Sequence, residues 1–174
     1  FAALDAKGGV AAAAGAGCSA GLLVLGLLAH QTLEATLAAA VLGSCLGFLQ
    51  LNIGRSRKHL GTGGSLFLGF LIAVTALRLQ LPANGTTSVL AVLACIALPL
   101  IDTAVVTLPR FLAARPLWRP GKDHLAHRLS ARGMHRRGIV LTHTGAALLG
   151  GLAAAVSVKE RSPVPAGAAL VAAA

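Results

Sequence analysis

The stretch from Pro99 to Arg137 has the residue types best suited to chemistry. It begins inside an apolar run, where Asp102 lies among Ile, Val and Leu. It continues as a basic segment holding His124 and His127, which share a face if the segment is helical. Basic side chains and protonated histidines bind phosphate oxygens, so the pattern favours an anion site over a zinc site. The basic residues are Arg110, Arg115, Arg119, Lys122, Arg128, Arg132, Arg136 and Arg137.

A carboxylate inside an apolar run is a functional candidate because burying it in a bilayer costs about 2.5–3.5 kcal/mol. The alternative for Asp102 is a purely structural pairing with a neighbouring helix. The alternative for His124 and His127 is a place on the surface of a basic loop.

Two further stretches could join this site. Asp5 and Lys7 precede the first apolar run and are followed by two glycines, which allow close approach of a ligand. The sequence Gly61-Thr-Gly-Gly-Ser65 is expected to form a turn that opens a helix, with free N–H groups suited to a phosphate. It lacks the lysine of a P-loop, and both stretches can also be read as ordinary helix starts.

The composition indicates a membrane protein. The chain is 56% hydrophobic and 11% charged, whereas soluble domains have about 25% charged residues. Its mean hydropathy is +0.79. Cys18, Cys45 and Cys95 lie in apolar runs and are interpreted as core residues.

The apolar runs predict an all-α fold, a polytopic membrane helix bundle with five transmembrane helices and the start of a sixth. Residues 1–174 would form one partial transmembrane domain of a longer protein. The expected spans are 10–29, 32–51, 64–81, 87–108, 138–158 and 163–174. Within them, Glu34 is expected where water can reach it, and Arg78 is expected to extend toward the nearer surface.

The distribution of Lys and Arg predicts the topology. If the N-terminus is cytoplasmic, residues 1–9 and the loops 52–63 and 109–137 hold twelve of the 15 Lys and Arg residues. This bias is what membrane insertion requires, so the net charge of +10 does not argue for nucleic acid. All three candidate stretches fall on the cytoplasmic side, which is why we expect them to form one site.

Several motifs together resemble the polyprenyl-phosphate N-acetylhexosamine-1-phosphate transferases, glycosyltransferase family 4. PLIDT at 99–103 with the downstream Arg110 is similar to a family helix. KDHLAHRL at 122–129 resembles the histidine motif, with Ala126 at its middle histidine. Residues 48–70 follow the pattern FLxxN, Gly-Asp-x-Gly-Ser, Leu-Gly-Phe, and residues 1–11 resemble a further motif. The resemblance is to the C-terminal half of an actinobacterial-type enzyme.

The resemblance implies transfer of a sugar-1-phosphate, GlcNAc-1-phosphate, from a UDP-sugar to a polyprenyl phosphate in cell-envelope biosynthesis. It implies Mg²⁺ as cofactor and a multi-pass enzyme of the plasma membrane with a cytoplasmic active face; a homodimer is left open. The catalytic candidates are Asp5, Asp102, His124 and His127. The substrate-binding candidates are Asn52, Gly61, Gly64, Ser65, Arg115, Lys122 and Arg128.

The chain departs from the family pattern at two acidic positions. Thr62 stands where the magnesium-binding aspartate is expected, and Gly8 stands where a second aspartate is expected near the nucleobase. The alternative function is therefore a degenerate relative that binds a nucleotide-sugar, a lipid phosphate or a partner protein without catalysis. A transporter ranks third, because it would need polar residues in several spans and Asp102 is nearly alone.

Overall fold

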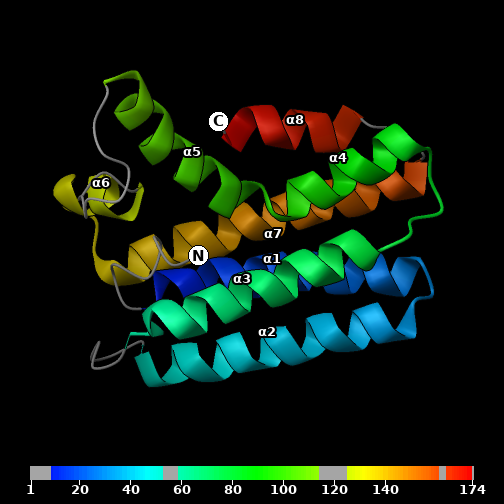
Figure 1. Ribbon diagram of the computed structural model, residues 1–174, viewed down its shortest axis with the longest axis horizontal. Coiled ribbons are helices and arrows are strands. Elements are labelled where there is room, and N and C mark those ends of the chain that lie inside the picture. The colour runs from blue at the N-terminus through cyan, green and yellow to red at the C-terminus, as the bar shows by residue number, and fades with distance from the viewer. Residues whose placement is uncertain (1–8, 53–58, 114–124, 161–163, 174) are drawn as a thin grey trace.

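The computed structural model of the chain describes residues 9–52, 59–113, 125–160 and 164–173, and every regular element in these ranges is an α-helix (Figure 1). The all-α prediction is therefore confirmed. The helices are α1 (Val10–Leu28), α2 (Thr32–Asn52), α3 (Gly61–Arg78), α4 (Gly85–Cys95), α5 (Ala97–Leu112), α6 (Leu125–Ala131), α7 (Arg136–Glu160) and α8 (Val164–Ala173).

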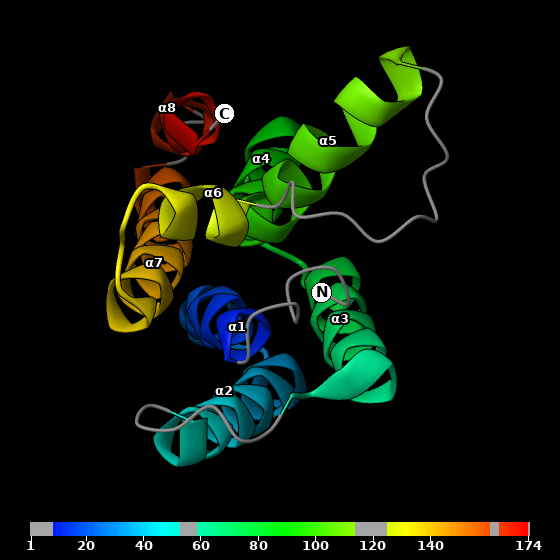
Figure 2. The same ribbon diagram turned by 90° about the vertical axis from the view of Figure 1, so that its left-hand side faces the viewer.

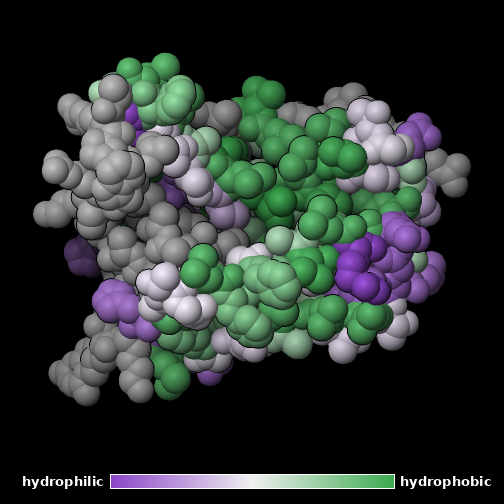
Figure 3. Space-filling model, viewed as in Figure 1, coloured by the Kyte–Doolittle hydropathy of each residue, from purple (hydrophilic) through white to green (hydrophobic). Residues whose placement is uncertain are grey.

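Four of the described helices, α1, α2, α3 and α7, are long and apolar enough to cross a membrane. The bent pair α4–α5 makes a fifth if it is counted as one span. Large hydrophobic side chains such as Leu46, Phe70 and Leu149 are exposed on these helices. Figure 3 shows hydrophobic residues across the middle of the visible face and hydrophilic ones toward its right-hand end. The chain is therefore a multi-pass membrane protein.

The segment expected as one straight span at 87–108 is instead two helices that meet at 72°. Helix α4 ends at Cys95, and Pro99 lies in the first turn of α5. Proline has no N–H to donate, and its ring clashes with the carbonyl four residues earlier, which here is that of Cys95. The chain therefore bends at Ile96, and α5 leaves the bundle obliquely (Figure 1).

Other helix bounds also differ from the expected ones. Helix α3 begins at Gly61, so the glycine-rich segment expected as a turn is the first turn of the helix. Helix α5 continues through Pro109 to Leu112, and the expected loop 109–137 contains α6. Helix α8 has 10 residues, a length of roughly 15 Å, about half of the hydrocarbon core of a bilayer.

Helix α1 is the centre of the bundle, in contact with α2, α3, α4 and α7 (Figure 2). Its first half is a run of alanine and glycine, and nearly all of these residues are buried. Small side chains let neighbouring helix backbones approach closely, which is how helices associate in a bilayer without a hydrophobic driving force. Cys18 of α1, Cys45 of α2 and Cys95 of α4 are buried and form no disulfide. The interpretation of these cysteines as core residues is therefore confirmed.

Helices α1 and α7 pack closely against each other and run in the same direction (Figure 1). A Cβ atom added to Gly17 would lie 2.4 Å from the Cβ of Ala147. One turn later, a Cβ added to Gly21 would lie 2.9 Å from the Cα of Gly151. The small residues spaced four apart on both helices therefore set the separation of α1 and α7.

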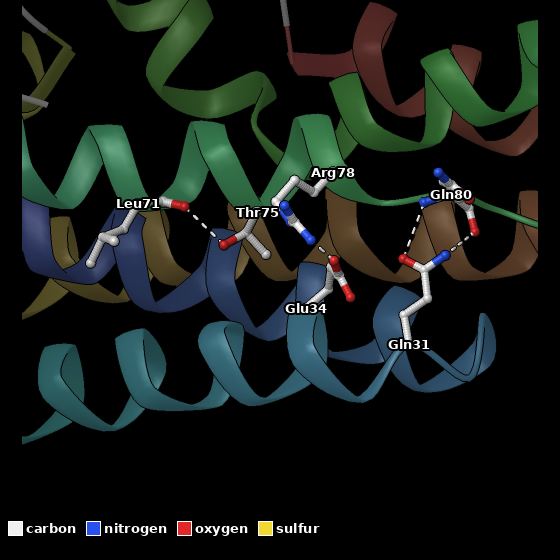
Figure 4. A network of polar contacts seen from close by, with 6 residues as sticks. All are labelled: Gln31, Glu34, Leu71, Thr75, Arg78 and Gln80. Carbon is white, nitrogen blue, oxygen red and sulfur yellow. Dashed lines mark hydrogen bonds and ion pairs between the residues drawn. The ribbon is translucent and has the colours of Figure 1, made fainter.

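Polar contacts join α2 to α3 at the end of the bundle opposite the start of α1 (Figure 4). The Gln31 side chain donates to the carbonyl of Gln80 at 2.6 Å and accepts from its N–H at 3.2 Å. Nε of Arg78 lies 3.2 Å from Oε1 of Glu34. Glu34 is only 8% exposed, so the expectation that water reaches it is wrong: a cation from α3 compensates its burial.

Substituting Gly17 with alanine tests the α1–α7 contact. Gly17→Ala is expected to destabilise the protein by about 1–3 kcal/mol, because the added methyl group overlaps Ala147. Gly43→Ala on α2 is the matched control, since nothing lies within 4 Å of its added Cβ. The control should leave stability unchanged or raise it by up to about 1 kcal/mol. Unfolding free energies in detergent micelles measure both, and equal effects would contradict the assigned contact.

Removing the cation tests the Glu34–Arg78 pair. Arg78→Ala is expected to cost about 1–3 kcal/mol in unfolding free energy, because it leaves a buried carboxylate without its partner. Lys159→Ala removes an exposed cation elsewhere on the bundle and should change stability by less than about 0.5 kcal/mol. If Arg78→Ala is as mild as Lys159→Ala, the ion pair does not stabilise the fold.

Candidate functional site

The three stretches expected to form one site come from segments whose described parts meet at one end of the bundle (left side of Figure 1). Helices α1, α3 and α7 begin at this end, α2 finishes there, and α6 lies beside them. Viewed from this end, α1 lies between the other elements (Figure 2). The bundle therefore gathers residues from distant parts of the sequence on one surface.

Asp102 is a buried residue of α5 that connects this helix to α6. The residue is 1% exposed, and its Oδ1 accepts a hydrogen bond from the backbone N–H of Leu125 at 2.7 Å. Leu125 is the first residue of α6. The first N–H groups of a helix have no partner within the helix, and the helix dipole favours a negative charge there. A carboxylate on α5 therefore holds the start of the helix that carries part of the histidine motif.

The bend before α5 determines where Asp102 lies. Along α5 the buried residues Leu98, Asp102 and Val106 recur every fourth position and form one face. Thr103 and Thr107 lie off this face and donate to the carbonyls of Pro99 and Thr103, at 2.7 and 2.8 Å. Their hydroxyl groups are therefore satisfied within the helix, whereas the carboxylate of Asp102 lies on the buried face of α5.

Asn52 and the glycine-rich segment lie at the ends of α2 and α3. Asn52 is the last residue of α2 and is 3% exposed. Ser65 is fully buried, and its hydroxyl group donates to the carbonyl of Gly61. Gly61 has a φ of +73°, which glycine adopts readily. Because Gly61–Ser65 is helical, the groups that it offers to an anion are the N–H groups of the first turn of α3.

The remaining candidates are only partly described. Asp5, Arg115, Lys122 and His124 lie outside the described residues. Helix α6 includes His127, whose side chain is also outside the described part. Arg128 on the same helix is exposed. The pairing of His124 with His127 therefore stays a prediction, while the backbone that carries His127 and Arg128 is placed beside Asp102.

The described residues do not fit a magnesium site. Among them, no group of three or more His, Cys, Asp or Glu side chains lies close enough to hold a metal ion. Asp102 directs one oxygen to the N–H of Leu125, and the exposed Thr62 offers only a hydroxyl group in the first turn of α3. Mg²⁺ prefers several hard oxygen ligands, mainly carboxylates and water.

Sequence reasoning gave no role to His143, and the structure buries it. The residue is 1% exposed on α7, and its Nδ1 donates to the carbonyl of Ile139 at 2.7 Å. Its Nε2 has no hydrogen-bond partner in the part of the chain that the structure describes. The sequence signal that could have indicated this burial is spacing: His143 lies four residues from Ile139 and four from Ala147, which are both buried.

Two substitutions of Asp102 test whether its hydrogen bond to Leu125 stabilises the start of α6. In Asp102→Ala the N–H of Leu125 loses its acceptor, so its hydrogen exchange should accelerate by about tenfold or more, corresponding to about 1.5–3 kcal/mol. Asp102→Asn keeps a carbonyl oxygen at the same position and should exchange at an intermediate rate. Amide exchange of the full-length protein, followed by mass spectrometry, measures both. Unchanged exchange in Asp102→Ala would show that α6 is held by other contacts.

Comparisons with known proteins agree with the motifs. Residues 2–80 match the sequence model of a family described as glycosyl transferase family 4. A protein of Streptomyces coelicolor, provisionally named a glycosyltransferase, is 35% identical over 85% of this chain and 36% of its own length. A Mycobacterium leprae protein named decaprenyl-phosphate N-acetylglucosaminephosphotransferase is 33% identical over 62% of this chain and 30% of its own length.

A Bacillus subtilis protein, provisionally named an undecaprenyl-phosphate N-acetylglucosaminyl 1-phosphate transferase, is 32% identical over 72% of this chain and 37% of its own length. No solved structure gives a significant match. The chain spans about a third of the length of these curated relatives. Residues 2–80 therefore match glycosyl transferase family 4, and most of the chain is similar to these curated proteins.

Proposed function

We propose that this protein transfers a sugar-1-phosphate, GlcNAc-1-phosphate, from a UDP-sugar to a polyprenyl phosphate in the membrane. The names of the relatives support the reaction and the acceptor. The observation that carries the proposal is the hydrogen bond from Leu125 to Asp102. It secures the helix of the histidine motif at the end of a bundle of spanning helices, where a lipid phosphate and a water-soluble nucleotide can meet.

The reaction is one phosphoryl transfer. An oxygen of the lipid phosphate attacks the β-phosphorus of the UDP-sugar and forms a new P–O bond. The bond from that phosphorus to the oxygen shared with the α-phosphate breaks, and UMP leaves. The products are UMP and a polyprenyl diphosphate that bears the sugar. Such a reaction needs positioning of two anionic groups and compensation of their charge.

The residues at the site end suit these two tasks. The exposed Arg128 on α6 can contact a phosphate, and the first N–H groups of α3 favour an anion through the helix dipole. Arg115, Lys122, His124 and His127 are expected to add further phosphate contacts. Asp102 acts through the backbone of α6, which makes it a positioning residue. Asp5 is expected to organise the nucleotide end.

The topology is part of the same proposal. The excess of Lys and Arg in the segments at the site end favours a cytoplasmic site, and UDP-sugars are cytoplasmic donors. We infer a location in the plasma membrane with the site facing the cytoplasm; a homodimer stays open.

The test is transfer of labelled sugar-phosphate from UDP-GlcNAc to polyprenyl phosphate, in membranes carrying the full-length protein. The unmodified protein should transfer the label. His124→Ala should lower the rate by about 100-fold or more, as expected for loss of a group that stabilises transition-state charge. His30→Ala changes a histidine at the opposite end of the bundle and should leave the rate within about twofold.

Thr62→Asp addresses the alternative of a degenerate relative. If the unmodified protein is inactive and Thr62→Asp transfers label, the protein is a scaffold that has lost a metal ligand. If neither transfers label while a known transferase works in the same membranes, the proposed reaction is wrong and a binding role takes its place.

A further inference from the structure

The turn between α6 and α7, residues 132–135, has a defined shape. The N–H of Met134 donates to the carbonyl of Leu129 at 3.2 Å, and the N–H of Gly133 donates to the carbonyl of Ser130 at 3.0 Å. Gly133 has a φ of +84°. These two hydrogen bonds and the left-handed glycine form a Schellman motif, which ends α6. The turn therefore places the side chains beside it in a fixed arrangement.

The same turn packs against the start of α7. A Cβ atom added to Gly138 would lie 3.0 Å from Cγ of Met134, so the Met134 side chain lies over α7. The N–H of Ile139 donates to the carbonyl of His135 at 3.1 Å, which extends the hydrogen bonding of α7 into the turn. Figure 2 shows the turn at the edge of the molecule, on the side of α7 away from α3. The turn is therefore a peripheral part of the site end.

Two exposed arginines flank this turn. Arg132 follows the last residue of α6, and Arg137 lies in the first turn of α7. The acids in the described part of the chain do not balance them, since Glu34 and Glu160 lie at the opposite end of the bundle. Asp102 is only 1% exposed. The described acids therefore leave this surface positively charged.

Beyond Arg137, α7 has an apolar stripe on its outer face. The stripe follows Arg137 at intervals of four or seven residues, which recur on one face of a helix. Its members are between 40% and 70% exposed, and they are Leu141, Leu148, Leu152 and Val156. Helix α7 is a candidate membrane span, so the stripe faces lipid tails. Arg137 therefore lies at the head-group end of a lipid-facing stripe.

We propose that an anionic phospholipid of the surrounding bilayer binds at this surface. Its head group contacts Arg132 and Arg137, and one of its acyl chains lies along the stripe of α7. Guanidinium groups match the geometry of phosphate oxygens, and basic residues next to a membrane attract anionic lipids. The proposal rests on α7 as a span and on two exposed cations at its start, and it is independent of the transfer reaction.

Photochemical crosslinking tests the occupant. A diazirine amino acid replaces Leu141, which is 70% exposed and one turn beyond Arg137. The same replacement at Leu152, 60% exposed on the same stripe, is the control, because it lies about 17 Å further along the helix. The full-length protein is placed in vesicles of equal phosphatidylglycerol and phosphatidylcholine with a small fraction of polyprenyl phosphate. Mass spectrometry identifies the adducts.

The expected adduct at position 141 is phosphatidylglycerol, enriched over phosphatidylcholine by about fivefold or more, as one attraction of about 1 kcal/mol implies. Position 152 should show no preference between the two lipids, because the charges of the nearby Lys159 and Glu160 cancel. Labelling at position 152 also shows that each variant is inserted in the bilayer.

Substitutions of the two arginines test the head-group contact. Arg132→Gln together with Arg137→Gln should abolish the enrichment at position 141. Arg132→Lys together with Arg137→Lys keeps both charges and should retain it. Lys159→Gln removes an exposed cation at the opposite end of α7 and should leave it unchanged.

Four results would overturn the proposal. Equal labelling of both phospholipids at position 141 would mean contact with bulk lipid. Polyprenyl phosphate as the main adduct would assign the stripe to the acceptor of the proposed reaction. An adduct with another segment of the protein would show that protein covers the stripe. Enrichment that survives the two glutamine changes would mean that other residues hold the head group.

Discussion

The hydrogen bond between the backbone N–H of Leu125 and the buried carboxylate of Asp102 connects helix α5 to helix α6. A carboxylate inside a span costs about 2.5–3.5 kcal/mol. One backbone hydrogen bond to a charged group returns about 1.5–3 kcal/mol. The two values are similar, so the start of α6 can offset much of the cost of placing Asp102 in the protein. The burial of Asp102 and the position of α6 therefore depend on each other.

This arrangement requires a bundle that brings the right elements together. Gly17 and Gly21 let α7 approach α1 closely, with the two helices running in the same direction. The 72° bend between α4 and α5 turns Asp102 toward α6. A straight span would place the same residue along the bundle axis. The small residues and the bend thus do different tasks: one sets helix separation, and the other sets the direction of a single carboxylate.

Local sequence properties predicted much of this fold. The apolar runs gave four of the spanning helices to within about three residues, because length and hydropathy are properties of each segment alone. The bend at Ile96 was not predicted, although Pro99 was visible, because proline is also tolerated in the first turn of a helix. Gly61–Ser65 was expected as a turn because glycine is a poor helix former, and its place at the start of α3 overrides that preference.

The contacts between helices could not be predicted from the sequence. The burial of Glu34 depends on which helix brings Arg78 beside it, and no local pattern encodes that pairing. The same holds for Asp102: its type and apolar surroundings marked it as unusual, but its partner is a backbone group 23 residues further along the chain. The sequence therefore identified Asp102 and Glu34 as unusual residues. Their roles became clear only from the groups that the fold places beside them.

The most direct measurement compares the transfer rates of Asp102→Asn and Asp102→Ala in the full-length protein with UDP-GlcNAc and polyprenyl phosphate. If Asp102 acts by holding α6, the asparagine amide oxygen replaces the carboxylate in part. Asp102→Asn should then retain activity within about tenfold, while Asp102→Ala falls by a further tenfold or more, at about 1.4 kcal/mol per factor of ten. Equal loss of activity in both variants, with α6 still protected from exchange in Asp102→Asn, would contradict the account. The negative charge itself would then take part in the reaction.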